Sequence, residues 1–416
     1  MIVYKFGGAS VKDAGAIRNL YSIVAGAQLP LVVVVSALGK TTNALENVVN
    51  QSGRPSHEVD IAIASVLDYH LQVADELLGQ GNRAAAWISD SVAGIRDLLS
   101  VAGDRGPDWL YDQIVSLGEL WSTRIVEEYL RKRGLRSRWI DMREVLITDD
   151  RYRDANVIWS ESERRLRSAV KSDDAEIFVL QGFIGATASG NSTTLGREGS
   201  DYTAAIAANI LEAESVVIWK DVPGVLNADP GWMSDATLLD NISYKEAVEM
   251  SFSGAKVIHP KTIKPLHNRG IPLYVRSFLQ PDGSGTVISS NESSTESVPV
   301  FIRKENQVLL SLLPNDFSFV IGENLGKIFH LFYRHGIKTN LVQASAVSIA
   351  VCVDNDSDRI DALTSDLRGE FSFLYNKDVE MISLRYYTEE AIRKVTEGKK
   401  VLLEQRTRKS VRFVIG

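Results

Sequence analysis

The segments Ile177-Phe-Val-Leu-Gln-Gly-Phe-Ile-Gly185 and Leu195-Gly-Arg-Glu-Gly-Ser-Asp-Tyr-Thr-Ala-Ala205 decide the fold. The apolar run Ile177–Gln181 predicts a buried strand. A glycine-rich loop then runs through Gly185 to Gly199, and a helix is expected to start near Ser200. The start of such a helix presents free N–H groups and the positive end of a dipole to an anion. This stretch therefore predicts an anion site beyond the carboxyl end of a strand.

The same alternation of strand and helix extends over the first 290 residues. Further strands are expected at Ile2–Phe6, Leu31–Ser36, Ser137–Asp141 and Ser215–Lys220, and helical periods fill the region from Glu58 to Arg133. Alternation of this kind predicts an α/β fold, with a mainly parallel sheet sandwiched by helices. Ligands of such sheets bind beyond the carboxyl ends of the strands, where the glycine-rich and polar loops of this chain lie.

The pattern changes after Ser289–Ser297, a polar segment of small residues that we interpret as a linker. Two shorter rounds of a βαββ pattern follow and predict two α+β modules. We expect one domain at 1–290 and a second region at 298–416, with a first module at about 306–380 and an abbreviated second one at about 381–416. The predicted strands are Val308–Leu313, Thr339–Ser345, Ala346–Val353, Val379–Arg385, Val401–Gln405 and Ser410–Ile415, and the predicted helices are Gly322–His335, Asp358–Glu370 and Glu389–Glu397.

The composition is that of a globular protein. The 416 residues are 44% apolar and 24% charged, and their net charge of −7 argues against a nucleic-acid surface. Cys352 is the single cysteine, so no internal disulfide can form, and we expect a buried thiol in a reducing compartment. The N-terminus does not resemble a signal peptide and no apolar run is long enough to span a membrane, so we expect a cytoplasmic protein without a membrane partner.

Two polar loops follow the first two predicted strands. Lys5-Phe-Gly-Gly-Ala-Ser10 offers a cation, and Gly7 and Gly8 let backbone amides approach a phosphate closely. The spacing is not that of a Walker A loop, and a simple glycine turn is the alternative. Ser36 and Thr42 lie in the second loop, which suits a small anion but reads equally well as an ordinary polar loop.

Charged residues accompany these loops. Glu119 lies on an apolar helix face, where a carboxylate needs a partner, either a substrate ammonium or an internal salt bridge. Arg197 can bind a carboxylate in bidentate fashion, and Asp201 offers a counter-charge for an ammonium or a lysine. Ser200 as a plain N-cap is the alternative reading of this helix start, although it does not explain Arg197 and Asp201 together.

A last group of charged residues follows the strand at Ser215–Lys220. The irregular loop that begins with Lys220 and Asp221 continues to Asp229, and Lys256 lies in Gly254-Ala-Lys-Val-Ile-His-Pro260, where it could reach a nucleotide. Alone, Lys256 reads more simply as a solvated surface charge. The six histidines show no metal-ligand spacing, so we expect no metal site formed by protein ligands alone.

Taken in order, these motifs resemble the aspartate kinases of the amino-acid kinase family. The family pattern K-F-G-G-[TS]-S corresponds to Lys5–Ser10, S-x-G-E to Ser116–Glu119, and G-A-K-V-[IL]-H-P to Gly254–Pro260. The strongest match is Gly196–Ala204, which is close to the family's G-R-G-G-S-D-Y-T-A. Further matches are Asp141-Met-Arg-Glu144, Thr148-Asp149, Ile271–Arg276 and Gly285-Thr286.

The resemblance implies phosphoryl transfer from ATP, with Mg²⁺, to the β-carboxylate of L-aspartate. This reaction gives 4-phospho-L-aspartate and is the first step toward lysine, threonine and methionine. Lys5 and Asp201 would be catalytic, with Asp201 orienting the charged side chains. Substrate would be bound by Ser36, Thr42, Glu119 and Arg197, and nucleotide by Lys5, Gly7, Gly8, Lys220, Asp221 and Lys256. Glu119 would hold the α-ammonium and Arg197 a carboxylate.

The chain departs from the family pattern in several places. Ala9 stands where threonine is usual, Lys220 where threonine is common, and Gly231 where a basic residue often follows Asp-Pro. The C-terminal region resembles tandem ACT modules, which are ferredoxin-like and usually bind amino-acid effectors. We therefore expect a homodimer. Asn340 stands where lysine-sensitive relatives tend to have aspartate, which predicts weak feedback by lysine. The alternatives are another phosphotransferase of the family and a non-catalytic amino-acid sensor.

Overall fold

The computed structural model describes all residues of the chain except 52–55, 172–173, 256, 292–297 and 317. Residue contacts divide it into two compact units. Unit 1 comprises Met1–Val225, Leu238–Val248 and Val257–Ser293, and unit 2 comprises Leu226–Thr237, Glu249–Lys256 and Ser294–Gly416. Most of the linker predicted at Ser289–Ser297 lies outside the described residues.

Unit 1 is built on a sheet whose described strands number eight, in the order β3-β5-β2-β1-β8-β10-β11-β9. The pairs from β3 to β10 are parallel, whereas β10 and β11 are antiparallel. The predicted parallel sheet is thereby confirmed. The strands are β1 (Ile2–Phe6), β2 (Leu31–Val35), β3 (Ser137–Ile140), β5 (Ile177–Gln181), β8 (Ser215–Lys220), β9 (Asn241–Ser243), β10 (Leu273–Ser277) and β11 (Thr286–Ser289).

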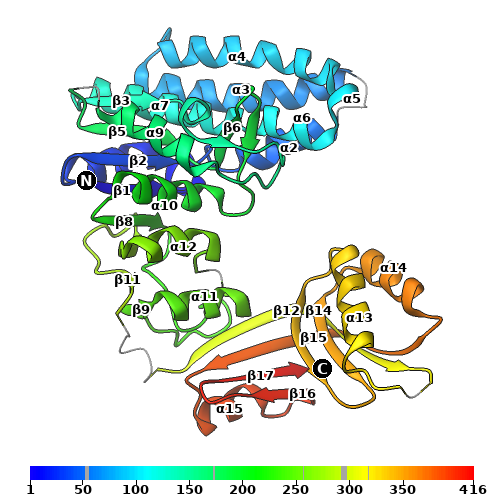
Figure 1. Cartoon of the computed structure of the whole chain (residues 1–416). Coiled ribbons are helices and arrows are strands. Elements are labelled where there is room, and N and C mark those ends of the chain that lie inside the picture. Colours follow the sequence, from blue (N-terminus) through cyan, green and yellow to red (C-terminus); the bar gives the residue numbers. More distant parts are fainter. Residues whose placement is uncertain (52–55, 172–173, 256, 292–297, 317) are drawn as a thin grey trace. The chain divides into compact units, whose positions relative to one another are not determined.

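Helices cover both faces of this sheet, as Figure 1 shows. Every residue of β2 and β5 is buried, which explains their unbroken apolar runs. The helices of unit 1 are α1 (Ala14–Ala25), α2 (Thr41–Asn50), α3 (Ser56–Leu78), α4 (Arg83–Ser100), α5 (Ala102–Arg105), α6 (Pro107–Val115), α7 (Leu117–Lys132), α8 (Met142–Val145), α9 (Trp159–Lys171), α10 (Gly199–Leu211) and α12 (Pro260–Arg269). Helix α11 (Tyr244–Ser253) begins in unit 1 and ends in unit 2.

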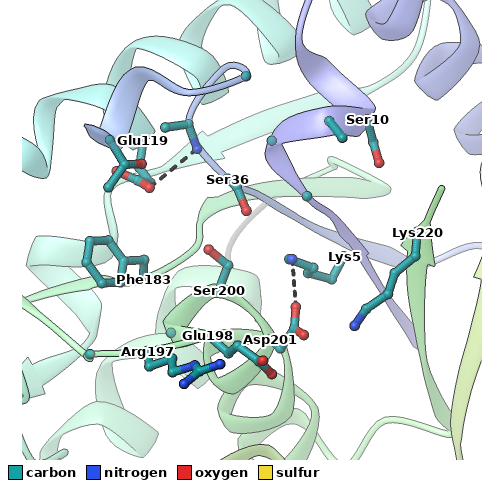
Figure 2. Close-up of a pocket in the computed structure, with 18 of the residues that line it drawn as sticks. Lys5, Ser10, Ser36, Glu119, Phe183, Arg197, Glu198, Ser200, Asp201 and Lys220 are labelled. Carbon is teal, nitrogen blue, oxygen red and sulfur yellow. Dashed lines mark hydrogen bonds and ion pairs between the residues drawn. The ribbon is translucent and has the colours of Figure 1, made fainter. Parts of the chain in front are cut away.

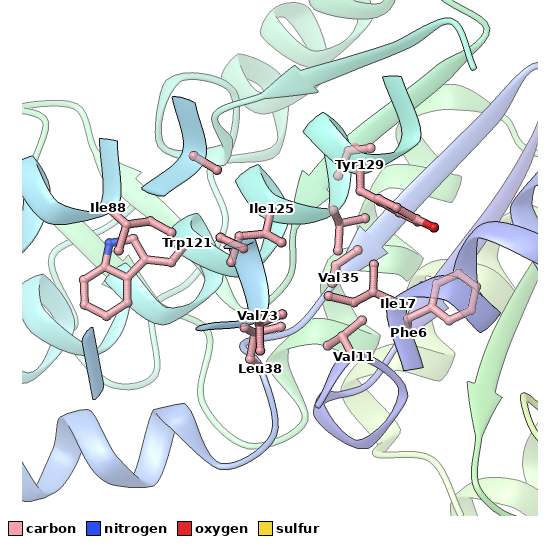
Figure 3. Packing of buried hydrophobic residues seen from close by; sticks show 14 of the residues in the cluster. Phe6, Val11, Ile17, Val35, Leu38, Val73, Ile88, Trp121, Ile125 and Tyr129 are labelled. Atoms are coloured by element: carbon pink, nitrogen blue, oxygen red, sulfur yellow. The ribbon is translucent and has the colours of Figure 1, made fainter. Parts of the chain in front are cut away.

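The main core of unit 1 lies on one face of the sheet. Phe6 and Val35 project from the strands toward Ile17 of α1 and toward Trp121 and Ile125 of α7, and all five side chains are fully buried (Figure 3). The other face packs against α10, where Ala204, Ala205, Ala207 and Ala208 are fully buried and allow a close approach to the strands. Helix α10 is therefore held rigidly beside β1.

A small second sheet of unit 1 was not predicted from the sequence. It consists of β4 (Ile147–Thr148), β6 (Ile184–Thr187) and β7 (Ser192–Thr194). Strands of two to four residues carry too little periodicity to be recognised. The hairpin of β6 and β7 shapes the chain between Gly185 and Gly199, which the sequence suggested to be one long loop.

The described strands of unit 2 form one antiparallel sheet of six, in the order β13-β14-β12-β15-β17-β16. They are β12 (Val300–Pro314), β13 (Thr339–Ala344), β14 (Ile349–Asp354), β15 (Phe371–Arg385), β16 (Val401–Arg406) and β17 (Ser410–Ile415), and the helices are α13 (Glu323–Arg334), α14 (Ser357–Leu367) and α15 (Glu389–Thr396). Helices and antiparallel strands in this arrangement agree with the predicted ACT-like α+β fold. Cys352 is a buried free thiol, as predicted.

Strands β12 and β15 are longer than the sequence indicated. The predicted strands Val308–Leu313 and Val379–Arg385 cover only part of each. The rest pairs along the same ladder, across a register shift between Lys304 and Gln307. A largely exposed polar stretch interrupts each strand, at 303–306 in β12 and at 376–378 in β15, so the sequence pattern breaks there. Among the described residues, no helix is long and apolar enough to cross a bilayer.

Candidate active site

A cavity of about 610 Å³ opens where β1, β2, β5 and β8 end. Parallel strands bring their carboxyl ends to one edge of a sheet, so loops that are distant in sequence meet there. Ten residues that the sequence singled out line this cavity: Lys5, Gly7, Gly8, Ser36, Thr42, Glu119, Arg197, Asp201, Lys220 and Asp221. Lys256 lies outside the described residues.

Figure 2 shows how the charged side chains are distributed around the cavity. Glu119 and Arg197 lie on one side, with Ser36 and Ser200 between them, and Lys5 and Lys220 lie on the other side. The cavity therefore has one end that offers both an anion and a cation and another end that offers two cations. All of these residues belong to unit 1.

The two glycines after β1 have different environments. A Cβ on Gly8 would lie 2.6 Å from the Gly39 carbonyl oxygen and 3.1 Å from that of Ala37, so only glycine fits there. A Cβ on Gly7 would meet only Lys5 Nζ, at 3.5 Å. Gly39 N–H also donates a 3.1 Å hydrogen bond to the Gly8 carbonyl. Gly8 is thus required by the packing of the first loop on the second, whereas Gly7 lies beside the lysine ammonium.

Lys5 forms a buried ion pair with Asp201. The Nζ–Oδ1 distance is 2.6 Å, and the two side chains are only 11% and 5% exposed. Lys5 is in the central strand β1, paired with Val34 and Ile218 on either side, and Asp201 is in the first turn of α10. The sequence left open whether Asp201 faces an ammonium ligand or a lysine, and its partner is Lys5.

Glu119 is a buried carboxylate without a cationic partner among the described residues. It accepts a 3.4 Å hydrogen bond from Ala37 N–H through Oε1, and its buried Oε2 has no partner in the described chain. Burial raises the pKa of Glu119 from 4.5 to about 8, although the Ala37 N–H lowers it somewhat. The internal salt bridge considered from the sequence is therefore absent, and a ligand cation would satisfy this group.

The start of α10 faces the cavity with Arg197, Ser200 and Asp201. The helix begins at Gly199 and is preceded by Glu198, so Ser200 lies inside the first turn and is not the N-cap suggested as an alternative from the sequence. Glu198 provides no side-chain cap, and the N–H groups of Gly199 and Asp201 donate to the carbonyls of Gly196 and Glu198 at 3.1 and 3.0 Å. Arg197 is exposed and has no ion-pair partner among the described residues.

Lys220, at the end of β8, points toward the helix that follows the Gly254–Pro260 motif. Its Nζ donates a 2.8 Å hydrogen bond to the Val257 carbonyl. The neighbouring Asp221 is exposed at the rim of the cavity. In the described residues no cluster of His, Cys, Asp or Glu could hold a metal ion by itself.

Four further cavity residues were not predicted from the sequence: Tyr111, Arg153, Phe183 and Glu198. Arg153, Phe183 and Glu198 have positive φ angles of 68°, 71° and 54°. This conformation is uncommon for residues other than glycine and is often found at functional sites. Only for Glu198 did the sequence carry a signal, because the family pattern has glycine at this position.

Comparison with known proteins finds relatives of this chain in the amino acid kinase family. The sequence model described as "Amino acid kinase family" matches residues 1–277. Over 387 residues the chain is 35% identical to lysine-sensitive aspartokinase 3 of Escherichia coli (strain K12), an alignment that covers 91% of this chain and 85% of that protein.

Two solved structures of E. coli aspartokinase III resemble the whole chain at 28% sequence identity. The R-state complex with aspartate and ADP matches with a TM-score of 0.85 and covers 100% of this chain and 96% of that one. The T-state complex with lysine and aspartate matches with a TM-score of 0.80 and covers 100% and 95%.

We expect Glu119 to make the folded protein less stable as the pH rises. Because its pKa is about 8 when folded and close to 4.5 when unfolded, the folded protein retains a proton that the unfolded chain releases between these values. The free energy of unfolding should therefore fall across this window, by up to about 1.4 kcal/mol per pH unit. Glu119→Gln cannot titrate and should lack this contribution.

Urea unfolding of the wild-type and Glu119→Gln proteins at pH 5 to 8.5 measures the difference. All other titrating groups are common to both proteins. A difference in unfolding free energy that stays constant over this range would contradict the raised pKa.

Proposed function

This chain belongs to the amino acid kinase family and, within it, to the aspartokinases, and we propose that it transfers the γ-phosphoryl group of ATP to the β-carboxylate of L-aspartate. The observation that carries the proposal is the composition of the single cavity described above. It combines a buried carboxylate that needs a cation, an arginine that needs an anion, and a glycine loop next to a lysine. An amino acid with a second carboxylate and a phosphate donor satisfies all three.

The acceptor end of the cavity matches aspartate group by group. The α-ammonium would pair with Glu119, whose Oε2 has no other partner in the described chain. Arg197 would bind the α-carboxylate, and Ser36, Thr42 and Ser200 would add hydrogen bonds from the cavity wall. The β-carboxylate then remains free to point toward the cations at the other end.

The donor end provides charge stabilisation and not a covalent partner. A carboxylate is already a nucleophile at neutral pH, so its oxygen can attack the γ-phosphorus in line without a general base. Lys5 and the amides of Gly7 and Gly8 would neutralise charge on the transferring group, and Lys220 and Asp221 lie where the rest of the triphosphate would extend. Asp201 fixes Lys5 by their ion pair and so acts as a positioning residue.

The cavity fits a magnesium ion that arrives with the nucleotide. Mg²⁺ is usually bound by substrate phosphates, water and one or two carboxylates, without a complete protein cage. Asp221 is the exposed carboxylate of the cavity, whereas Asp201 is already paired with Lys5. When bound, the ion would add positive charge at the β- and γ-phosphate oxygens.

Unit 2 would be a regulatory region that supports a homodimer, with weak sensitivity to lysine. Asn340 is buried and already hydrogen-bonded on both sides of its amide. Its Nδ2 donates to Gln307 and Asp354 at 2.7 and 2.9 Å, and its Oδ1 accepts from Lys304 at 2.9 Å. The residue is neutral and its polar atoms are in use, so it offers little to a ligand ammonium.

The reaction can be tested directly with purified protein, Mg-ATP and a panel of acceptors. L-Aspartate should give an acyl phosphate, detected as a hydroxamate after hydroxylamine trapping, together with stoichiometric ADP. L-Glutamate, N-acetylglutamate and UMP are the control acceptors. Turnover of any control without turnover of aspartate would refute the assignment.

Substitutions at the two ends of the cavity should have different kinetic effects. Lys5→Ala should lower kcat by about 10²–10³-fold, because Lys5 acts on charge that develops in the transition state. Arg197→Ala should mainly raise the KM for aspartate, since a carboxylate clamp acts equally in the ground and transition states. An Arg197→Ala enzyme with unchanged aspartate KM would exclude Arg197 from substrate binding.

Millimolar lysine should inhibit the wild-type enzyme only weakly. Without an acidic partner for its desolvated ammonium, lysine loses about 2–5 kcal/mol of binding free energy, which lowers its affinity roughly 30-fold or more. Asn340→Asp supplies this charge and should increase lysine sensitivity, with threonine and methionine as control effectors. Complete inhibition of the wild-type enzyme by sub-millimolar lysine would show that Asn340 does not set the sensitivity.

A further inference from the structure

Glu198 occupies a backbone position that disfavours it. Its φ and ψ are 54° and 29°, a left-handed conformation in which Cβ crowds the backbone. Glycine avoids this crowding, and the family pattern has glycine at this position. The presence of a glutamate therefore needs an explanation from what its side chain does.

The side chain of Glu198 reaches from the cavity to a segment that does not line it. Its Oε2 accepts a 2.9 Å hydrogen bond from the backbone N–H of His259, the residue that caps α12. Lys220, the other departure from the family pattern in the cavity, donates to Val257, two residues earlier. Two side chains that the family pattern does not contain thus converge on the backbone of Val257–His259.

The neighbours of Glu198 are the residues that face the substrate. Arg197 precedes it directly, and Ser200 and Asp201 follow in the same turn (Figure 2). The segment that Glu198 contacts lies in the Gly254–Pro260 motif, whose last residue begins α12. One carboxylate therefore links the turn that carries Arg197 to the motif whose Val257 carbonyl accepts a hydrogen bond from Lys220.

We propose that Glu198 is a positioning residue that couples the acceptor end of the cavity to the nucleotide end. The inference rests on the proposed function, because the two ends are defined by aspartate and ATP. Without the Glu198–His259 hydrogen bond, the turn that carries Arg197 loses its direct contact with His259, while α10 remains joined to α12 by the hydrogen bond from Asn209 to the Pro265 carbonyl. Both substrates then bind to a cavity whose two halves are less well ordered.

Three substitutions at position 198 distinguish the effect of losing the hydrogen bond from the effect of relieving the backbone strain. Glu198→Gln keeps the length and one acceptor oxygen, and its kcat/KM values should stay within about threefold of wild type. Glu198→Ala removes the acceptor and should lower kcat/KM for aspartate and for ATP by about tenfold or more, chiefly through KM. Glu198→Gly also removes the acceptor but relieves the strain, so it should be as impaired kinetically while melting at a higher temperature than Glu198→Ala.

Glu212 provides a matched control within the same helix. It has the same left-handed φ of 54°, at the C-terminal end of α10, and it pairs with Arg167 and Arg269 outside the cavity. Glu212→Gly relieves the same kind of strain without removing a contact in the site. Its kinetic constants should equal those of the wild-type enzyme.

Amide hydrogen exchange at His259 tests the contact independently of turnover. The amide should be protected in the wild-type protein and in Glu198→Gln, and it should exchange faster in Glu198→Ala and Glu198→Gly. Equal protection in all four proteins, kinetic constants for Glu198→Ala that match wild type, or a Glu198→Gln enzyme as impaired as Glu198→Ala would each overturn the inference.

Failure of the proposed function would give a different result, namely no aspartate turnover by the wild-type protein. In that case calorimetric titration with ADP replaces kinetics. An affinity for ADP that drops in Glu198→Ala and is retained in Glu198→Gln would still support the coupling. An unchanged affinity in Glu198→Ala would overturn it.

Discussion

The buried ion pair of Lys5 and Asp201 is the interaction on which the rest of the site depends. Burying two charges is favourable only if they are held close together and in fixed orientation. The fold provides this because Lys5 is in the central strand, with hydrogen-bonded neighbours on both sides, while Asp201 is in a helix that packs on that strand through fully buried alanines. The lysine ammonium therefore has a fixed position beside the glycine loop. Arg197 and Ser200 are aligned by the same helix start.

The sequence predicted those strands of unit 1 that are long enough to show a run of apolar residues. Strands β1, β5 and β8 have the predicted bounds because each is a short, mostly apolar run that ends at a glycine or polar loop, and β5 is buried throughout. The residues that line the cavity could be named because their motifs follow these strands. The short strands β4, β6 and β7 were missed because so few residues show no period. The first parts of β12 and β15 were missed because an exposed polar stretch separates them from the apolar run that was recognised.

The finer chemistry of the site lies in contacts that one sequence does not reveal. From the sequence, Gly8 was expected to let a phosphate approach the backbone. The structure adds a second reason for glycine, because the Gly39 carbonyl leaves no room for a Cβ at this position. Lys220 was expected from the resemblance to bind nucleotide, and the structure adds that its ammonium contacts the Val257 carbonyl. In both cases the partner comes from a segment far away in the chain. Such pairings follow from how the loops pack, which a motif does not encode.

The buried Glu119 also bears on how this protein evolves. Its unpaired oxygen and raised pKa make it a group that folding alone would disfavour, since an apolar side chain of similar size would fill the same space without desolvating a charge. In a lineage that no longer needed catalysis, drift toward stability would replace this carboxylate early. Replacement of Glu119 is therefore the change expected first in a relative that keeps this fold without binding a cation there. Such sites distinguish a working enzyme from a descendant that has kept only the shape.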